Sequence, residues 1–263
     1  MTTEAYPGAR DFERHMALAR SELPGEDYLS LLAHLHDVLT PRIYLEIGVS
    51  SGKTVRLARP DTRAIGIDPE PKIAFVLPDN VQVCRETSDA FFARDGVRAE
   101  LGEGGIDFAF IDGMHLFEFA LRDFMNVERH ASRDGVVAIH DCYPLDAETS
   151  TRERTTVYWT GDVWRAVVAL RTWRPDLAVH TLAAPPSGLA LVTRLDPRSR
   201  VLESRYDEIV DETLKCDYTQ ISARKADLLN VCAASKEAVA KLVATRPERG
   251  VGAERKSRSN PPS

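Results

Sequence analysis

The residues best suited to chemistry recur where short apolar runs of the sequence end. Carboxylates and imidazoles can move protons or bind metal ions, and glycines let a backbone approach a ligand closely. Because the carboxyl ends of parallel strands meet at one edge of a sheet, we expect an active site at that edge. The residues concerned are Gly48 and Gly52 after the first run, Asp68 after the second, Asp112 after the fourth, and His140 and Asp141 after the fifth.

Five apolar runs alternate with polar segments that suit helices, and they cover residues 42–48, 63–68, 81–86, 106–112 and 135–141. Such alternation is typical of a parallel sheet wrapped by helices. The stretch 177–194 predicts two antiparallel strands around a Pro-Gly turn. We therefore expect an α/β, Rossmann-like fold. Its seven-stranded, mostly parallel sheet would have helices on both faces, an antiparallel last strand, and added N-terminal and C-terminal helices.

The pattern divides the chain into four segments. Residues 1–40 have apolar positions at helical spacing, closed by Pro41, and form a predicted N-terminal helical cap. Residues 41–196 are the predicted catalytic domain, and residues 197–245 a predicted helical C-terminal extension. Residues 246–263 are rich in Arg, Gly, Ser and Pro, which predicts a disordered tail.

Composition narrows the classes of partner. The 263 residues carry a net charge of −6, and the sequence pI is about 5.7. This balance argues against nucleic acid and membrane as partners and favours a small-molecule substrate. The four cysteines form no CxxC pair, which disfavours a zinc cluster or a disulfide framework.

Two further expectations concern compartment and assembly. The N-terminus lacks the apolar core of a signal peptide, and no apolar run reaches membrane-spanning length, so we expect a cytoplasmic protein. The helical segments at both ends offer apolar faces that favour a homodimer.

The turn after the first run decides between cofactors. A dinucleotide fingerprint needs the spacing G-x-G-x-x-G, whereas this turn reads Glu46-x-Gly48-x-Ser50-x-Gly52. It resembles the acid-x-Gly-x-Gly-x-Gly turn of class I S-adenosylmethionine methyltransferases, with Ser50 in place of the middle glycine. A tight turn without a ligand is the alternative interpretation.

That resemblance implies roles for the residues around the turn. Small residues at 48, 50 and 52 would let the backbone approach the methionine portion, and Glu46 would orient it. Asp68 would accept hydrogen bonds from both ribose hydroxyls. Ser88 and Asp89 would contact adenine, although a helix N-cap explains them equally well.

Two later strand ends narrow the family. Asp112 is followed by Gly-x-His, and the fifth run ends in His140-Asp141. Over residues 44–194 the chain resembles the metal-dependent, macrocin-type sugar O-methyltransferases and, more distantly, the catechol O-methyltransferases. A narrower resemblance is to the 1-O-methyltransferases of methylmannose polysaccharide biosynthesis. The implied cofactors are S-adenosylmethionine and a divalent metal, with Mg²⁺ expected, and the implied partner is a saccharide acceptor.

The resemblance also implies the catalytic residues. Asp112, His140 and Asp141 would hold the metal, Asp112 would also touch the cofactor, and His115 would be the general base. A histidine has an ordinary pKa near 6.5, which suits proton abstraction at neutral pH. Members of this family usually have a carboxylate at the position of His140, so the site would tolerate Mn²⁺, Fe²⁺ or Co²⁺, or the metal would rest on the two aspartates. As a further alternative, His115 only caps a helix.

Acceptor contacts are expected in the loop after the fifth strand and in the helix that follows it. The candidates are Tyr143, Arg152, Arg154, Asp162 and Trp164. Other functions stay open at this point: methylation of a non-sugar natural product, a non-haem iron oxygenase, a nicotinamide dehydrogenase, and a binding protein without turnover.

Overall fold

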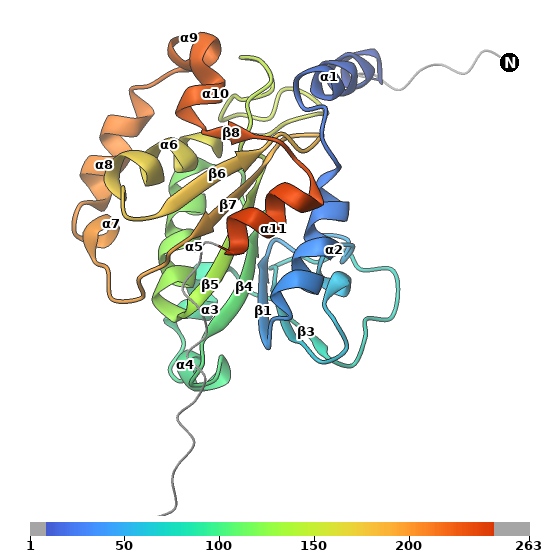
Figure 1. Cartoon of the computed structure of the whole chain (residues 1–263), viewed down its shortest axis with the longest axis vertical. Coiled ribbons are helices and arrows are strands. Elements are labelled where there is room, and N and C mark those ends of the chain that lie inside the picture. Colours follow the sequence, from blue (N-terminus) through green and yellow to red (C-terminus); the bar gives the residue numbers. More distant parts are fainter. Residues whose placement is uncertain (1–8, 245–263) are drawn as a thin grey trace, which may run out of the picture.

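The structure is a computed structural model that describes residues 9–244. Its centre is one eight-stranded sheet with the order β3-β2-β1-β4-β5-β7-β6-β8 (Figure 1). Strands β1 to β5 run parallel, and β7 is antiparallel to both of its neighbours. The strands are β1 (Ile43–Ile47), β2 (Arg63–Ile67), β3 (Val81–Cys84), β4 (Ile106–Ile111), β5 (Ala131–His140), β6 (Ala178–Leu182), β7 (Leu189–Thr193) and β8 (Val231–Cys232).

The expected α/β, Rossmann-like architecture is confirmed, with one more strand than predicted. The additional strand, β8, pairs in parallel with β6 at the edge of the sheet. Two residues are too short to show the alternation that marks a strand, and they lie in a segment whose pattern is helical. The expected antiparallel pair around the Pro-Gly turn is β6 and β7.

Burial of the central strands on both sides explains their continuous apolar sequence. All six residues of β4 are buried. Ala109 and Ile111 pack into a core on one face, and Phe108 and Phe110 pack into a core on the other. This alternation follows the two-residue period of a strand, and both faces need helices to cover them.

Helices cover the two faces unequally. One face carries α1 (Ala9–Glu22), α3 (Ser88–Ala93), α4 (Val97–Glu100), α5 (Phe117–His130), α6 (Trp164–Trp173) and α8 (Tyr206–Leu214). The other face carries α2 (Tyr28–Leu39), the short 3-10 helix η1 (Val55–Leu57) and α11 (Lys236–Ala244), and α11 packs beside α2 (Figure 1). The remaining short elements are α7 (Val201–Ser204), α9 (Tyr218–Ile221), η2 (Ser222–Arg224) and α10 (Lys225–Leu228).

The N-terminal segment forms two helices, α1 and α2, with a turn between them. Pro24 and Gly25 lie in that turn, where a Cβ on Gly25 would stand 2.3 Å from the Ala234 side chain. The Asp27 side chain caps α2 by accepting a hydrogen bond from the backbone N–H of Ser30. The four-segment division stays a prediction, and the expected tail, 246–263, lies outside the described residues.

Two findings bear on compartment and redox state. No helix within residues 9–244 combines the length and the apolar character needed to cross a lipid bilayer. The four cysteines, all in the described part of the chain, are free thiols, so neither a disulfide nor a cysteine-based metal site is present there.

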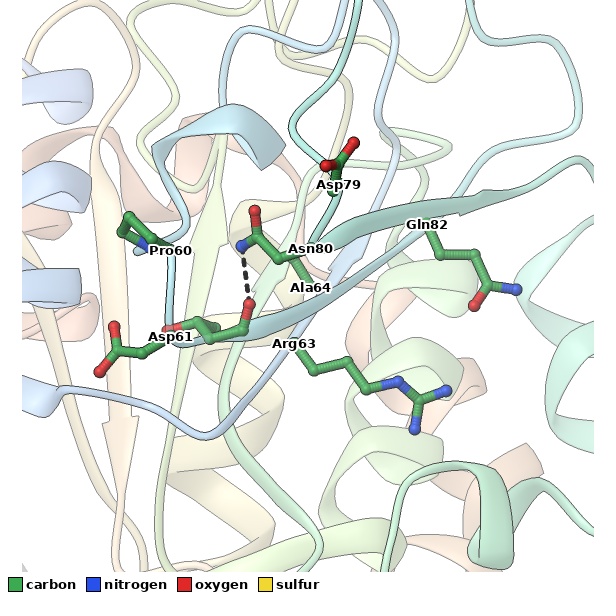
Figure 2. Close-up of a pocket in the computed structure, with 8 residues that line it drawn as sticks. Pro60, Asp61, Arg63, Ala64, Asp79, Asn80 and Gln82 are labelled. Carbon is green, nitrogen blue, oxygen red and sulfur yellow. Dashed lines mark hydrogen bonds between the residues drawn. The ribbon is translucent and has the colours of Figure 1, made fainter.

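One cavity lies at the amino ends of β2 and β3. It has a volume of about 310 Å³ and lies beside the start of β2, where Asn80 donates a hydrogen bond to the Thr62 carbonyl (Figure 2). Its lining is Pro60, Asp61, Thr62, Arg63, Ala64, Asp79, Asn80 and Gln82. It lies at the amino ends of parallel strands, away from the edge where such sheets bind ligands.

A buried ion pair joins α5 to the chain after α6 and gives a stability prediction. Arg174 is 1% exposed and donates to both carboxylate oxygens of Glu128 at 2.7 and 2.9 Å. We expect Glu128→Gln to lower the free energy of unfolding by about 3 kcal/mol, because it removes the buried negative charge that faces the buried guanidinium. Urea denaturation measures this change.

The matched control is Asp176→Asn, because Asp176 also binds Arg174 but its side chain is 55% exposed. We expect a cost below about 1 kcal/mol for this change. Equal losses of unfolding free energy in the two variants would contradict a special role for the buried Glu128–Arg174 pair.

Candidate functional site

The register of the sheet brings the predicted site residues together. Ile47 pairs with Ile67 on one side and with Ile111 on the other, and Ile111 pairs with Ile139. The residues that follow each of these isoleucines therefore lie side by side at the carboxyl edge of the sheet. They are Gly48, Asp68, Asp112 and His140.

The turn after β1 packs its backbone against the end of β4. Gly48 has φ +89°, and a Cβ there would lie 2.1 Å from the Asp112 carbonyl oxygen. Ser50 and Gly52 also have positive φ values of 46° and 78°. The turn thus needs residues that tolerate the left-handed region, and at Gly48 there is no room for any side chain.

Asp68 is tied into the same turn. Its Oδ2 accepts a hydrogen bond from the backbone N–H of Ser50 at 2.7 Å, and its Oδ1 accepts one from Glu70 at 2.8 Å. Each carboxylate oxygen keeps a further lone pair, so Asp68 can still accept hydrogen bonds from a diol.

Glu46 lies beneath the turn and is fully buried. It accepts hydrogen bonds from Tyr44 Oη at 2.6 Å and from Thr54 Oγ1 at 2.7 Å. Burial raises the pKa of Glu46 to about 8, against the opposing effect of these two hydrogen bonds. In this arrangement Glu46 holds the turn through Thr54, and its expected contact with a methionine portion stays a prediction.

A cavity of about 280 Å³, here called the strand-end cavity, opens beside the turn. Gly48, Asp68, Ser88 and Asp89 all line it, as expected for a cofactor site, whereas Ser50 and Gly52 shape the turn behind it. The other lining residues were missed from sequence: Ile47, Ile67, Pro69, Thr87, Gly113, Met114, Phe119 and Asp123.

The expected helix N-cap in the stretch 87–92 is confirmed, and the capping residue is Thr87. Thr87, not Ser88, caps α3 by accepting from the N–H of Ala90. Ser88 Oγ instead donates to Asp123 at 2.5 Å, and Asp89 pairs with Arg122 at 2.8 Å.

Two aspartates and two histidines form what we call the Asp–His cluster at the ends of β4 and β5. His115 Nδ1 lies 3.1 Å from Asp141 Oδ2, and His115 Nε2 lies 3.5 Å from Asp112 Oδ1. His140 Nδ1 lies 3.2 Å from Asp112 and 3.6 Å from Asp141. Both His115 and Asp141 have positive φ, +54° and +53°, a conformation that the surrounding structure must hold in place.

The cluster fits a divalent cation through a set of ligands that differs from the expected one. One ligand atom from each of Asp112, His115 and Asp141 can come within 4.8 Å of the other two. His115 Nδ1 is buried and makes no hydrogen bond within the described residues, although Asp141 Oδ2 lies 3.1 Å away. His140, the expected third ligand, lies against both aspartates, and its Nε2 is 3.3 Å from Ser187 Oγ. Two carboxylates with imidazole suit Mg²⁺, Mn²⁺ or Fe²⁺.

Electrostatics in the cluster changes the argument for a general base. Burial alone would lower the pKa of His115, but Asp141 and Asp112 outweigh it and raise the pKa to about 9. The same charges raise the pKa of His140. Burial would raise the pKa of Asp112, yet the two histidines hold it well below its ordinary range. The two carboxylates that face the ring therefore shift the pKa of His115 away from the ordinary value near 6.5 that suits proton abstraction at neutral pH.

The acceptor candidates lie around this cluster, but several have internal partners. Trp164 is 1% exposed, and Asp162 is fully buried. Asp162 accepts from the backbone N–H of Phe117 and pairs with Arg152 at 2.7 Å. Tyr143 Oη donates to Glu22 at 2.8 Å. Arg154 stays exposed and bonds the Val157 carbonyl.

Two rings next to the cluster were not expected. The indole of Trp159 stacks on His115 with 5.4 Å between ring centroids. Tyr28, at the start of α2, stacks on His140 at 4.1 Å. Sequence gives no signal for Tyr28, because only the folded chain brings α2 to the end of β5. These rings fix the planes of the two imidazoles.

Comparison with known proteins agrees with this geometry. Residues 45–142, which run from β1 to just after β5, match the family model of a methyltransferase domain. The match agrees with the expectation of methyl-transfer chemistry. Among proteins with curated functions, none matches the sequence.

Several solved structures are similar to this chain at low sequence identity. Cofactor-bound Rv0187 from MTB is 18% identical with a TM-score of 0.51, over 74% of this chain and 100% of that one. The O-methyltransferase TomG from Streptomyces achromogenes, in complex with SAM, is 18% identical with a TM-score of 0.48, over 70% and 89% of the two chains. An O-methyltransferase from Bacillus cereus, in complex with SAH, is 13% identical with a TM-score of 0.47, over 74% and 93%.

Substitution of Gly48 tests the close approach in the turn. We expect Gly48→Ala to abolish measurable cofactor binding and to lower the melting temperature, because the new Cβ would overlap the Asp112 carbonyl. Calorimetric titration with S-adenosylhomocysteine and a thermal melt measure the two effects.

Gly102→Ala is the matched control for that change. Gly102 also has positive φ, +78°, but a Cβ there would meet nothing within 4 Å. The Gly102→Ala substitution should lower the free energy of unfolding by about 1 kcal/mol through backbone strain and leave cofactor binding unchanged. Intact binding in Gly48→Ala would show that the turn does not shape the cofactor site.

The raised pKa of His115 predicts how the metal-depleted protein responds to pH. A histidine whose pKa is raised by folding stabilises the native state fully below its unfolded pKa, about 6.5. That stabilisation is lost as the pH rises through about 9. We expect stability to fall across this window and the His115 ring signals in NMR to titrate near pH 9. An inflection at or below 6.5 would contradict the geometry of the cluster.

Proposed function

We propose that the protein is a metal-dependent O-methyltransferase that transfers the methyl group of S-adenosylmethionine to a hydroxyl of a saccharide. The observation that carries the proposal is the contact between the two sites. Gly113 and Met114 line the strand-end cavity and directly connect Asp112 to His115 of the Asp–His cluster. A methyl donor in the cavity would therefore lie beside groups that can hold and deprotonate a hydroxyl.

The chain's own residues supply most of the proposed mechanism. The turn at Gly48 and the carboxylate of Asp68 bind and orient the donor, and Asp112 and Asp141 would hold the cation. When bound, a divalent cation lowers the pKa of an acceptor hydroxyl and fixes its position. The hydroxyl oxygen then bonds to the methyl carbon as the carbon–sulfur bond breaks, and S-adenosylhomocysteine leaves.

The acceptor's proton needs a base at the cluster. His115 is the proposed base, although in the metal-free protein the facing carboxylates keep it protonated at neutral pH. Neutralising these carboxylates removes the cause of the raised pKa, so His115 can then accept a proton.

The saccharide acceptor rests on the resemblance of the two strand ends to macrocin-type enzymes. The narrower resemblance, to 1-O-methyltransferases of methylmannose polysaccharide biosynthesis, is proposed on the same basis. Exposed Arg154 close to Trp159 offers hydrogen-bond donors of the kind that sugar hydroxyls accept. The homodimer and the cytoplasmic compartment stay predictions.

The iron-oxygenase alternative finds no support in the architecture. Its metal ligands would belong to an antiparallel barrel, whereas the Asp–His cluster ends parallel strands β4 and β5. The dinucleotide alternative lacks its third glycine, as the sequence already indicated.

Substitution of the cluster aspartates tests the proposal. We expect Asp112→Asn and Asp141→Asn each to reduce metal-stimulated methyl transfer by on the order of 100-fold, because each removes a charged ligand. Transfer from labelled S-adenosylmethionine to a panel of mono- and oligosaccharides is measured during a Mg²⁺ titration of EDTA-treated protein.

The control is Asp61→Asn, at the opposite edge of the sheet (Figure 2), which should leave transfer unchanged. Asp68→Ala should weaken cofactor binding instead of metal dependence. If metal still stimulates methyl transfer in both cluster variants, the assignment of Asp112 and Asp141 as metal ligands is wrong.

A further inference from the structure

Asp123 is a buried carboxylic acid that the proposed mechanism does not use. It lies in the second turn of α5 and is only 4% exposed, on the helix face that also buries Ala120, Phe124 and Val127. It lines the strand-end cavity and also a small hollow beneath the Asp–His cluster. A carboxyl group on an apolar helix face costs stability unless its oxygens have partners.

Only one of the two oxygens has a partner of its own. Asp123 Oδ1 accepts the hydroxyl of Ser88 at 2.5 Å, the one hydrogen bond that Asp123 makes in the described part of the chain. Oδ2 lies 3.5 Å from where a Cβ on Gly113 would stand. The neighbouring cation, Arg122, is paired with Asp89. Burial raises the pKa of Asp123 to about 6, against a lowering effect of Ser88, so the group is largely ionised at neutral pH.

The cavity indicates which part of a ligand Asp123 would meet. Apolar groups of Ile67, Pro69 and Phe119 line it, which suits a planar ring, and Asp68 supplies the acceptor for a ribose. When adenine is joined to ribose through N9, its ring nitrogens are acceptors and the exocyclic amine is its only N–H donor. An ionised carboxylate only accepts hydrogen bonds, so this amine is the one group on the base that it can pair with.

We propose that Asp123 Oδ2 accepts a hydrogen bond from the exocyclic amine of S-adenosylmethionine and thereby selects adenine over a base with a carbonyl at that position. The inference rests on the proposed function, since it takes S-adenosylmethionine as the ligand. Ser88 would then act through Asp123 by holding Oδ1, so that Oδ2 faces the base. In hypoxanthine the carbonyl would place its lone pairs against those of the carboxylate.

A pair of ligands tests the proposal without acceptor or metal. S-adenosylhomocysteine and S-inosylhomocysteine differ at the proposed contact, where an amine is replaced by a carbonyl, and at the adjacent N1, which gains a hydrogen. We expect the wild-type protein to bind the adenosyl compound about 10- to 100-fold more tightly in calorimetric titration, the range for a hydrogen bond to a charged group. Asp123→Leu removes the acceptor, so the preference should fall to within about threefold.

Two further variants make the result specific. Asp123→Asn keeps the shape, and its amide can bond the Ser88 hydroxyl and turn its NH₂ toward the base, which should narrow or reverse the preference. Asp211→Asn on α8 is the matched control and should keep the wild-type ratio, because Asp211 is exposed on the surface of that helix. Thermal melts show which variants are folded.

The outcomes separate the inference from the proposed function. An unchanged ratio in folded Asp123→Leu overturns the inference, and if that variant does not fold, an unchanged ratio in Asp123→Asn does so. Equal weakening of both ligands shows a structural role for Asp123 and also overturns it. Failure of the wild-type protein to bind either compound would overturn the proposed function itself.

Discussion

The site depends on one backbone contact, the approach of Gly48 to the carbonyl of Asp112. It joins the turn after β1, which shapes the strand-end cavity, to the end of β4, which carries the Asp–His cluster. Hydrogen bonds from Gly48 N–H to Ile67 and from Asp112 N–H to Ile47 extend the parallel ladder up to the same point. Backbone contacts therefore fix the distance between the proposed donor site and the proposed metal site. Side-chain motion cannot change this distance.

The second constraint is electrostatic. Asp112 and Asp141 face each other across His115, and His140 lies against both. Like charges at this distance need a compensating cation. The two carboxylates favour the protonated form of the imidazoles beside them, which explains the raised pKa values of both histidines. A divalent cation would take over that role and release the protons, so metal binding and the state of the base are linked.

Sequence predicted the parts of this molecule that follow from periodicity. The five parallel strands and their polar ends could be found because strands buried on both faces have continuous apolar runs. The register then forces Gly48, Asp68, Asp112 and His140 onto one edge. The eighth strand was missed because two residues are too few to show the alternation of buried and exposed side chains that marks a strand.

Side-chain direction and long-range contacts could not be predicted in the same way. Trp164 was expected near the acceptor, but it lies on the buried face of α6. Asp123 was missed because a single acidic residue in a helical pattern usually lies on the solvent-exposed face of the helix. Tyr28 reaches His140 only through packing of α2 on the sheet. Within the described residues, His115 and not His140 joins the aspartates as a group of possible metal ligands, and the expected role of His140 as a ligand stays a prediction.

The central claim is that one edge of the sheet binds a methyl donor beside a divalent cation. Crystals of the protein grown with S-adenosylhomocysteine and Mn²⁺, measured for anomalous scattering, test it most directly. The account predicts S-adenosylhomocysteine in the strand-end cavity with its ribose on Asp68. It also predicts one manganese peak within coordinating distance of Asp112 and Asp141. A manganese-free cluster, or a ligand bound elsewhere, would contradict it.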